Sequence, residues 1–173
     1  TGSVRRRAQL MRMRPDLQFV DLRGNIQTRL SKIPDGGAIV MAVAALEILG
    51  MAEHIAQVLD IDVAVPMVGQ GSVAVEARSD DMTTLEILSA IDHVASRYAV
   101  ETERAFLAEL GAGCSLPVGA HLTKDGVFHA FMATDDCSDS VQLVGSIGDT
   151  DDNLAVGIAA AHECRTRLAE VTE

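Results

Sequence analysis

The sequence predicts an α/β chain in two parts: a doubly wound α/β half-domain, then a small α+β domain that begins near residue 90. In the first part, short apolar segments alternate with helical patterns, which is the β-α-β-α rhythm of a sheet covered by helices. The apolar run at 38–44 is continuous, as in a parallel strand buried on both faces. In the second part, a helical pattern precedes three strand patterns and a final helix.

The first half is punctuated by clear helix boundaries. Ser3 is a preferred N-cap residue, and it predicts a helix that runs to about Arg14, where Pro15 ends it. The glycine-rich breaker that begins at Pro34 separates the next helix from the apolar run. The remaining expected elements are strands at 18–22, 38–44 and 72–77 and helices at 26–33 and 46–59.

The second half is expected to be hairpin-based. Helical spacing of apolar residues covers 83–109, and a final helix is expected at 152–170. Lys124-Asp125-Gly126 is a turn signal between two strand patterns, so it predicts a hairpin. The three expected strands are 118–122, 127–133 and 141–145.

Composition excludes several classes of protein. No apolar run reaches the roughly 18 residues of a membrane span. Three cysteines at unrelated spacings argue against a disulfide framework, and a reducing cytoplasm is therefore expected. The five histidines show no ligand spacing, so no metal site is predicted. The chain starts with Thr and a basic stretch without a signal sequence, so we expect a fragment or a processed piece.

Positive charge is concentrated at the start of an acidic protein. The net charge is −11, yet residues 1–32 carry eight basic and two acidic side chains. Such a region suits a small local anion, whereas the acidic remainder would repel a long polyanion. A solvated basic arm or a nucleic-acid patch is the alternative. The nucleic-acid version is disfavoured because few aromatic residues are available for base stacking.

The arginines are expected to meet in one crevice. Arg5 and Arg6 fall in the first turn of the first helix, where the backbone already presents positive charge, so a bound carboxylate would resolve the conflict. Arg23 and Arg29 flank the next strand-to-helix turn, where open α/β sheets bind ligands. With the Ser3 hydroxyl, these side chains predict binding of small carboxylates.

Cys114 is a candidate reactive thiol. It lies in GAGCSLPVG, between a helix and a strand, in a loop type that leaves a thiol accessible. The alternative is a small buried residue, the usual role of a free cysteine. Cys137 and Cys164 fit that ordinary role, and no neighbouring His or Asp in the sequence suggests a protease-like pair.

Four motifs in this order resemble the porphobilinogen deaminase (hydroxymethylbilane synthase) family. TGSVRRRAQL is similar to the family's T-S-S-x-R-R-x-x-Q-L, and RPDLQFVDLRGNIQTRLSKI is similar to its R-P-D-L…L-R-G-N…T-R-L-x-K-L. VPMVGQGSVAVEAR resembles P-A-V-G-Q-G-x-x-x-I-E-x-R, and ETERAFLAELGAGCSLPVGAH resembles the segment that holds the cofactor cysteine. The similarity is strongest at 1–33 and 65–120.

The resemblance implies an enzyme that condenses four porphobilinogen molecules into hydroxymethylbilane, a linear tetrapyrrole, with release of ammonia. It implies a dipyrromethane cofactor joined through a thioether to Cys114. Porphobilinogen and the growing polypyrrole are the implied partners, and the complete protein is expected to be a monomer. By motif position, Ser3, Arg5, Arg6 and Arg29 are implied to hold the cofactor, and Arg23 and Arg29 the substrate.

The resemblance also implies the domain layout. Residues 1–65 would be part of a periplasmic-binding-protein-like α/β domain that binds the pyrrole carboxylates. Residues 66–89 would cross back to an N-terminal domain missing from this chain, and 90–173 would form the C-terminal α+β domain with the cofactor cysteine. The family's catalytic Asp belongs to that missing domain, so the isolated chain is expected to be inactive and to expose apolar surface near 66–78.

One departure favours a second hypothesis. The family usually reads G-L-K-R-L-G where this chain has Ala45 to Gly50, so Glu47 and Ile48 replace a Lys-Arg pair. A charge reversal beside a polyanion-binding cleft is expected to weaken elongation. The alternative is therefore a diverged, non-catalytic carboxylate-binding module; a nucleic-acid-binding fragment is the third hypothesis.

Overall fold

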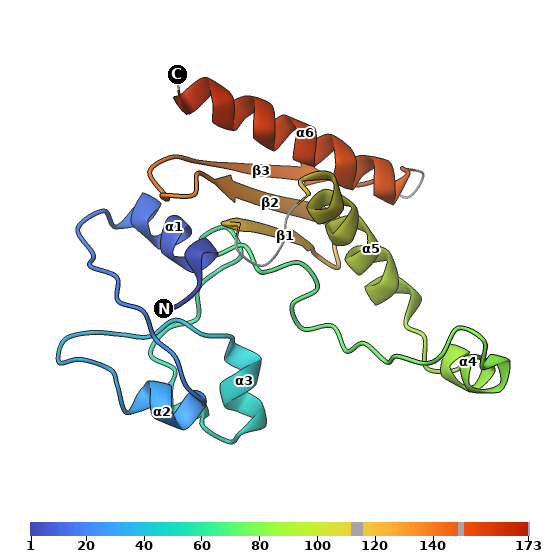
Figure 1. Cartoon of the computed structure of the whole chain (residues 1–173), viewed down its shortest axis with the longest axis horizontal. Coiled ribbons are helices and arrows are strands. Elements are labelled where there is room, and N and C mark those ends of the chain that lie inside the picture. Colours follow the sequence, from blue (N-terminus) through green and yellow to red (C-terminus); the bar gives the residue numbers. More distant parts are fainter. Residues whose placement is uncertain (112–115, 149–150, 173) are drawn as a thin grey trace.

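A computed structural model describes residues 1–111, 116–148 and 151–172 of the chain (Figure 1). The regular elements of the first half are short helices and a 3₁₀ turn, and a helix–sheet–helix unit makes up the second half. The elements are α1 (Val4–Met13), α2 (Ile26–Leu30), α3 (Val43–Ile48), η1 (Ala52–His54), α4 (Met82–Ser89), α5 (Val94–Glu109), β1 (Val118–Leu122), β2 (Val127–Ala133), β3 (Ser140–Ser146) and α6 (Asn153–Thr172).

The second half contains a three-stranded antiparallel sheet in the order β1-β2-β3. The register places Ala120 opposite Ala130, and Ala130 opposite Leu143. Gly126, at φ +76°, makes the turn between β1 and β2, and its N–H donates to the Thr123 carbonyl. The predicted strands, the hairpin and the final helix of this half are confirmed.

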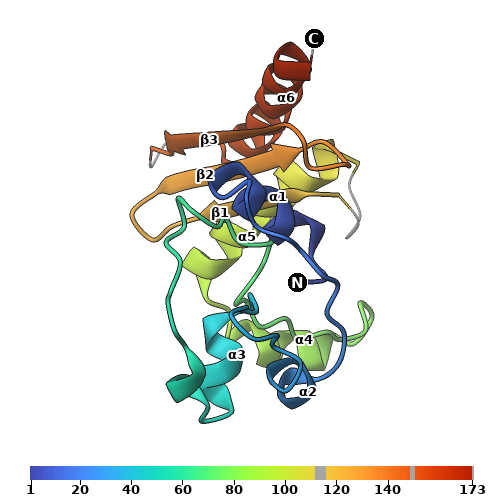
Figure 2. The ribbon, with the colours of Figure 1, turned by 90° about the vertical axis from the view of Figure 1, so that its left-hand side faces the viewer.

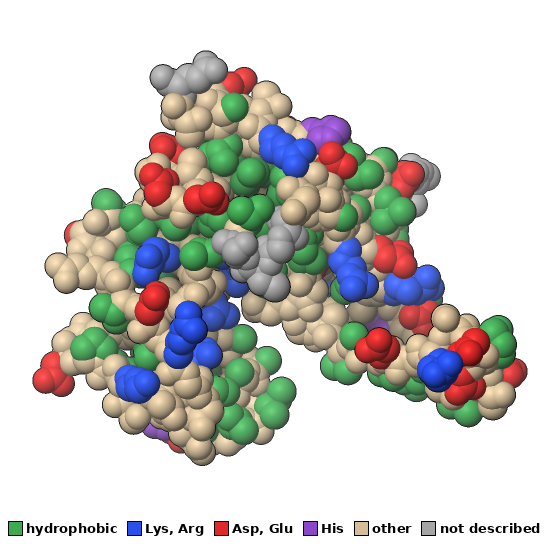
Figure 3. Space-filling view, in the orientation of Figure 1, with side chains coloured by type: hydrophobic (Ala, Val, Ile, Leu, Met, Phe, Trp, Pro, Cys, Tyr) green, Lys and Arg blue, Asp and Glu red, His purple; other side chains and the backbone are tan. Residues whose placement is uncertain are grey.

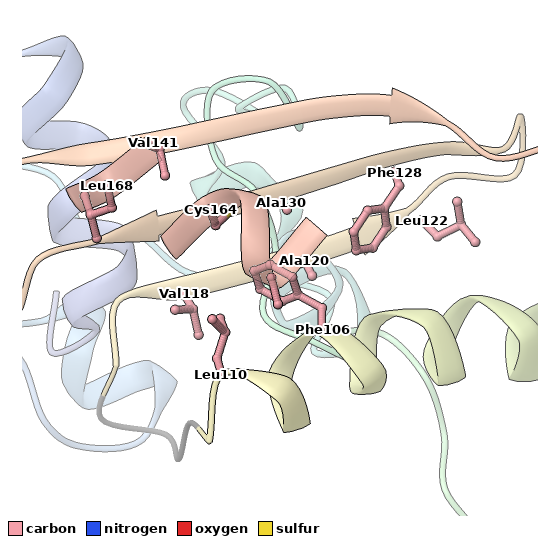
Figure 4. Close-up of a cluster of buried hydrophobic side chains, with 11 residues drawn as sticks. Phe106, Leu110, Val118, Ala120, Leu122, Phe128, Ala130, Val141, Cys164 and Leu168 are labelled. Atoms are coloured by element: carbon pink, nitrogen blue, oxygen red, sulfur yellow. The ribbon is translucent and has the colours of Figure 1, made fainter. Parts of the chain in front are cut away.

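Helices α5 and α6 cover one face of the sheet and enclose the main core (Figures 1 and 4). Successive strand residues point to opposite faces, so Val118, Ala120 and Leu122 all face the helices. The Phe106 and Phe128 rings pack edge to face at 6.2 Å between centroids. The helices approach closely at Gly157, where an added Cβ would lie 2.4 Å from the Thr102 carbonyl oxygen.

The opposite face of the sheet holds a second, smaller core. Phe131 and Ala133 point to this side and pack with Ala8 of α1 and with Val65, whose side chain is fully buried. Figure 2 shows α1 on the side of the sheet opposite to α6. The Arg12 guanidinium of α1 lies 6.0 Å from the Phe131 ring centroid, which adds a cation–π contact. Helix α1 and the chain around Val65 are therefore docked on the C-terminal sheet.

Helix α1 is confirmed as predicted. It runs from Val4 to Met13, with Ser3 as N-cap and Arg14 as C-cap, directly before Pro15. Helix α2 ends at Leu30, earlier than predicted, and α4 and α5 divide the predicted helix at 83–109. The predicted helix at 46–59 is wrong in extent: α3 spans Val43–Ile48 and ends before Gly50, whose φ of +65° suits a helix end.

The strands predicted at 18–22, 38–44 and 72–77 are wrong, because the structure shows no strand within residues 1–111. A strand exists through hydrogen bonds with a neighbouring strand, and none of these segments lies beside one in the described chain. The end of the apolar run becomes helical instead, since Ala and Leu at 44–46 are strong helix formers. The structure thus shows a mixed helix and sheet fold, and the doubly wound sheet is absent from the described residues.

Helices α2 and α3 lie side by side below α1, and α4 lies at the far end of an extended segment (Figures 1 and 2). This segment exposes Val73 and Val75, which are 91% and 57% accessible. Exposed apolar surface was expected near 66–78, and it is confirmed at these two valines. Residues 66–68, at the start of that range, are instead half-buried. Within the described residues, every helix is too short or too polar to cross a membrane.

Candidate functional site

The N-terminal turn of α1 sends adjacent arginines in different directions. The Ser3 hydroxyl accepts the Arg6 N–H at 3.4 Å and so caps the helix. Arg5 points into the protein and is only 6% exposed. Because successive residues on a helix are about 100° apart, Arg6 emerges on another side, next to α2 and α3. The first turn of α1 therefore places one arginine in the protein interior and the next in a surface pocket.

Arg5 is tied to the chain around Val65. Its Nη1 donates to the Val65 carbonyl, and its Nε is buried without a hydrogen-bond partner in the described residues. Burial, with a smaller contribution from the neighbouring Arg6 charge, lowers the pKa of Arg5 to about 10. A buried guanidinium without a carboxylate is costly, and an anion near the start of α1 would relieve that cost.

Arg6 and Arg29 line one pocket of about 580 Å³. Arg6 Nη1 donates to the Val40 carbonyl at 3.1 Å, and Arg29 Nε donates to the Gly24 carbonyl at 2.7 Å. These bonds fix both side chains and leave further guanidinium N–H groups for a ligand. Within the part of the chain that the structure describes, neither guanidinium has a carboxylate within 4.0 Å.

The pocket combines this cationic wall with an apolar one. The α2 side contributes Asn25, Ile26 and Gln27, and the chain leading into α3 contributes Met41 and Ala42. Ala45 and Leu49, four residues apart on the α3 side, complete the apolar wall. In the space-filling view, Lys and Arg side chains gather over the α1–α2 region (Figure 3). The arrangement suits a flat apolar ring that carries carboxylates.

The electrostatics of the pocket favour an anion. Burial lowers the pKa of Arg6, and the positive charge of Arg29 lowers it further. Both guanidiniums line the same pocket, so their positive charges repel each other. A bound carboxylate would screen this repulsion and accept charge-assisted hydrogen bonds from both arginines.

The structure brings together only part of the predicted set. Arg6 and Arg29 share the pocket, whereas Ser3 acts as the helix cap and Arg5 is directed to Val65. Arg23 is exposed and does not line the pocket. Cys114, the predicted attachment point, lies outside the described residues.

Glu47 and Ile48, expected beside the binding cleft, belong to α3 next to this pocket. Neither residue lines it, and Ile48 is 84% exposed. The reason is helical geometry: Ala45 and Leu49 are one turn apart and face the pocket, so Glu47 and Ile48 between them point elsewhere. The charge reversal at Glu47 therefore leaves the pocket lining unchanged.

Gln9 and Glu103 are buried polar residues that no sequence pattern predicted to be buried. Gln9 is 1% exposed and hydrogen-bonds the backbone of Val65, and Glu103 is 3% exposed and accepts hydrogen bonds from backbone amides. Both fall inside the family-like motifs quoted above, in RRAQL and ETERAF. Their place in these motifs was the available signal of a role. Gln and Glu are mostly exposed in proteins, so the residue type alone does not predict that either side chain is buried.

Comparison with known families gives two matches in chain order. Residues 1–86 match the model "Porphobilinogen deaminase, dipyromethane cofactor binding domain", and residues 97–166 match "Porphobilinogen deaminase, C-terminal domain". The Arg6–Arg29 pocket lies wholly within the first match.

Curated relatives agree with both matches. The chain is 44% identical over 160 residues to a porphobilinogen deaminase of Roseiflexus sp. (strain RS-1), covering 91% of this chain and 49% of that protein. It is 44% identical over 167 residues to that of Pelotomaculum thermopropionicum, covering 94% of this chain and 54% of the relative. For Thermobifida fusca the identity is 49% over 124 residues, or 70% of this chain and 39% of the relative.

The chain thus spans about half the length of the curated relatives it matches. Two successive domain models of one family match it, and the first matched region contains the cationic pocket. This chain belongs to the porphobilinogen deaminase family.

Proposed function

We propose that this chain is part of a hydroxymethylbilane synthase, which condenses porphobilinogen units into a linear tetrapyrrole with release of ammonia. The observation that carries the proposal is the pocket shared by Arg6 and Arg29, with its apolar wall at Ala45 and Leu49. Pyrroles with acetate and propionate substituents have this combination of a flat ring and carboxylates. The family membership supports the same substrate class.

The residues present fit a dipyrromethane cofactor. Arg6 and Arg29 offer guanidinium N–H groups without a carboxylate partner among the described residues, and the buried Arg5 Nε has no partner there either. When bound, the cofactor supplies the pyrrole primer on which the chain of substrate units grows. We propose that Cys114 carries it through a thioether, as the matching motif implies.

The chain's own residues would bind and orient the pyrrole carboxylates. Arg6 and Arg29 would hold them directly, since both line the pocket. Ser3 would hold the first turn of α1 in place as its N-cap. Arg5 would add positive potential at this turn from its buried position. Arg23, exposed beside Gly24 of the pocket wall, is proposed to meet the incoming or growing pyrroles.

The proposed domain layout follows from the same comparison. Residues 1–65 would be part of a periplasmic-binding-protein-like domain. Residues 66–89 would form the crossing segment, and 90–173 the C-terminal domain. The matches at 1–86 and 97–166 support a division of this kind. A monomeric, cytoplasmic protein is expected, and the inactivity of the isolated 173 residues stays a prediction.

A non-catalytic carboxylate-binding module gains no support from the structure or the relatives. Its motivation was the pair Glu47 and Ile48, and these residues do not line the pocket. The relatives described above all carry the name porphobilinogen deaminase. A failure to find the covalent adduct in the experiment below would favour this hypothesis.

Intact mass tests the proposal directly. The full natural polypeptide that contains these residues is incubated with porphobilinogen, weighed, and treated with Ehrlich's reagent for pyrroles. The expected result is a covalent adduct of two pyrrole units that is absent in Cys114→Ser and present in Cys137→Ser. A folded polypeptide that stays unmodified would overturn the enzyme assignment and favour the binding module.

A further inference from the structure

Glu103 is a buried carboxylate that the proposed chemistry does not use. It lies in the middle of α5 and is 3% exposed, although glutamate is seldom buried without a partner. Its contacts are N–H groups: among the described residues, no Lys or Arg lies within 4.0 Å of it. The carboxylate is therefore held in place by hydrogen bonds.

Both carboxylate oxygens accept hydrogen bonds from segments distant in the sequence. Oε2 accepts the backbone N–H of Gly69 at 2.6 Å. Oε1 accepts the backbone N–H of Leu122 at 3.0 Å, and it lies 3.1 Å from Nδ1 of His121. Both carboxylate oxygens of Glu103 thus act as acceptors for backbone N–H groups. One side chain of α5 thus joins the turn at Gly69 to the edge strand β1.

Gly69 follows the last hydrogen bond that the described residues show between the crossing chain and the sheet. Just before it, the Ala120 N–H donates to the Pro66 carbonyl at 3.1 Å. Gly69 itself lies in a tight turn, with φ of +70°, in which Gln70 N–H donates to the Met67 carbonyl. After this turn nearly all residues of 71–81 are exposed. The Glu103 contact therefore sets the place where the chain leaves the sheet.

We propose that Glu103 is a positioning residue that fixes the cofactor-binding region to β1, the strand that follows the Cys114 segment in sequence. Gly69 belongs to the match at 1–86, whereas Glu103 and Leu122 belong to the match at 97–166. The clamp therefore joins the region of the arginine pocket to the region of the proposed attachment point. Its role in the reaction rests on the proposed function, whereas the clamp itself can be tested without it.

Amide hydrogen exchange in the full natural polypeptide tests the clamp. In Glu103→Gln, the amide oxygen can still accept from Leu122, but its NH₂ group cannot accept from Gly69. Exchange at residues 67–71 should accelerate on the order of tenfold or more, while exchange at 120–124 changes little. Glu103→Ala should accelerate both. Glu101→Gln, on the same helix but exposed, should change neither.

Turnover tests the positioning role in cofactor-loaded protein whose adduct mass has been verified. Glu103→Gln leaves Arg6 and Arg29 in place, so KM should stay within about threefold while kcat falls about tenfold or more. Unchanged exchange at 67–71, or faster exchange there with an unchanged kcat, would overturn the proposal. A wild-type polypeptide with neither adduct nor turnover would instead overturn the proposed function, and the exchange comparison would still decide the clamp.

Discussion

The side-chain amide of Gln9 forms two hydrogen bonds with the backbone of Val65. Gln9 Oε1 accepts the Val65 N–H at 2.5 Å, and Gln9 Nε2 donates to the Val65 carbonyl at 3.1 Å. Gln9 lies on α1 and Val65 on a segment that packs with α1 and the sheet, and both are buried. A helix side chain therefore takes the place of a neighbouring strand for this residue.

Gln9→Leu should destabilise the protein, because it leaves the buried N–H of Val65 without a partner. The expected loss in the free energy of unfolding is about 1–3 kcal/mol, measured by urea denaturation. Gln18→Leu is the matched control: Gln18 is exposed, and its replacement should change stability by no more than about 0.5 kcal/mol. Equal effects of the two substitutions would contradict the pairing with Val65.

Gly119→Ala should disturb the same region from the side of the sheet. An added Cβ would lie 2.7 Å from the Pro66 carbonyl oxygen and 3.0 Å from that of Val65, and backbone atoms cannot yield cheaply. We expect the free energy of unfolding, measured by thermal denaturation, to fall by about 1–3 kcal/mol or more. Gly145→Ala, on β3 with nothing within 4 Å of the new Cβ, should cost far less. A tolerated Gly119→Ala would show that the chain at Val65 lies farther from β1.

Arg6→Met and Arg29→Met should each weaken binding of carboxylates in the pocket. Each removes charge-assisted hydrogen bonds, so the Kd for porphobilinogen, measured by calorimetry, should rise about tenfold or more. Arg78→Met is the control, because Arg78 pairs with Asp80 on an exposed segment outside the pocket. Binding that survives both pocket substitutions would locate the ligand elsewhere.

The Cys164 thiol should make stability sensitive to alkaline pH. Burial in the core raises its pKa from 9.0 to about 12. Below pH 9 the thiol is protonated in both the folded and the unfolded protein, so it adds no pH dependence. Between about pH 9 and 12 only the unfolded chain loses the proton, and stability falls by up to a few kcal/mol.

Cys164→Ala isolates this effect. The substitution should cost stability at neutral pH because it leaves a cavity, yet the gap between variant and wild type should narrow as the pH rises above 9. Equilibrium denaturation at several pH values measures that gap. A gap that stays constant to pH 11 would mean that the Cys164 thiol is not shielded. Thiol reagents should also modify Cys164 only on unfolding.

Much of the fold follows from local sequence signals. Ser3 and Pro15 bound α1, and Lys124-Asp125-Gly126 makes the β1–β2 turn, as predicted. These features depend on residues close together in the chain, such as a cap hydroxyl or a glycine with positive φ. The strands at 18–22, 38–44 and 72–77 were predicted from the same kind of pattern and are wrong, since a strand requires partners that a local pattern cannot supply.

By itself, the sequence determined the family and the cationic character of the site. The family follows from the order of short motifs, and the cationic character follows from the number of arginines near the start of the chain. The tertiary structure alone decided which arginine serves which purpose: Arg6 meets Arg29 in the pocket, while its neighbour Arg5 is buried against Val65. It also decided the burial of Glu103. The direction and burial of a side chain depend on segments packed from elsewhere in the chain, and sequence spacing does not encode those contacts.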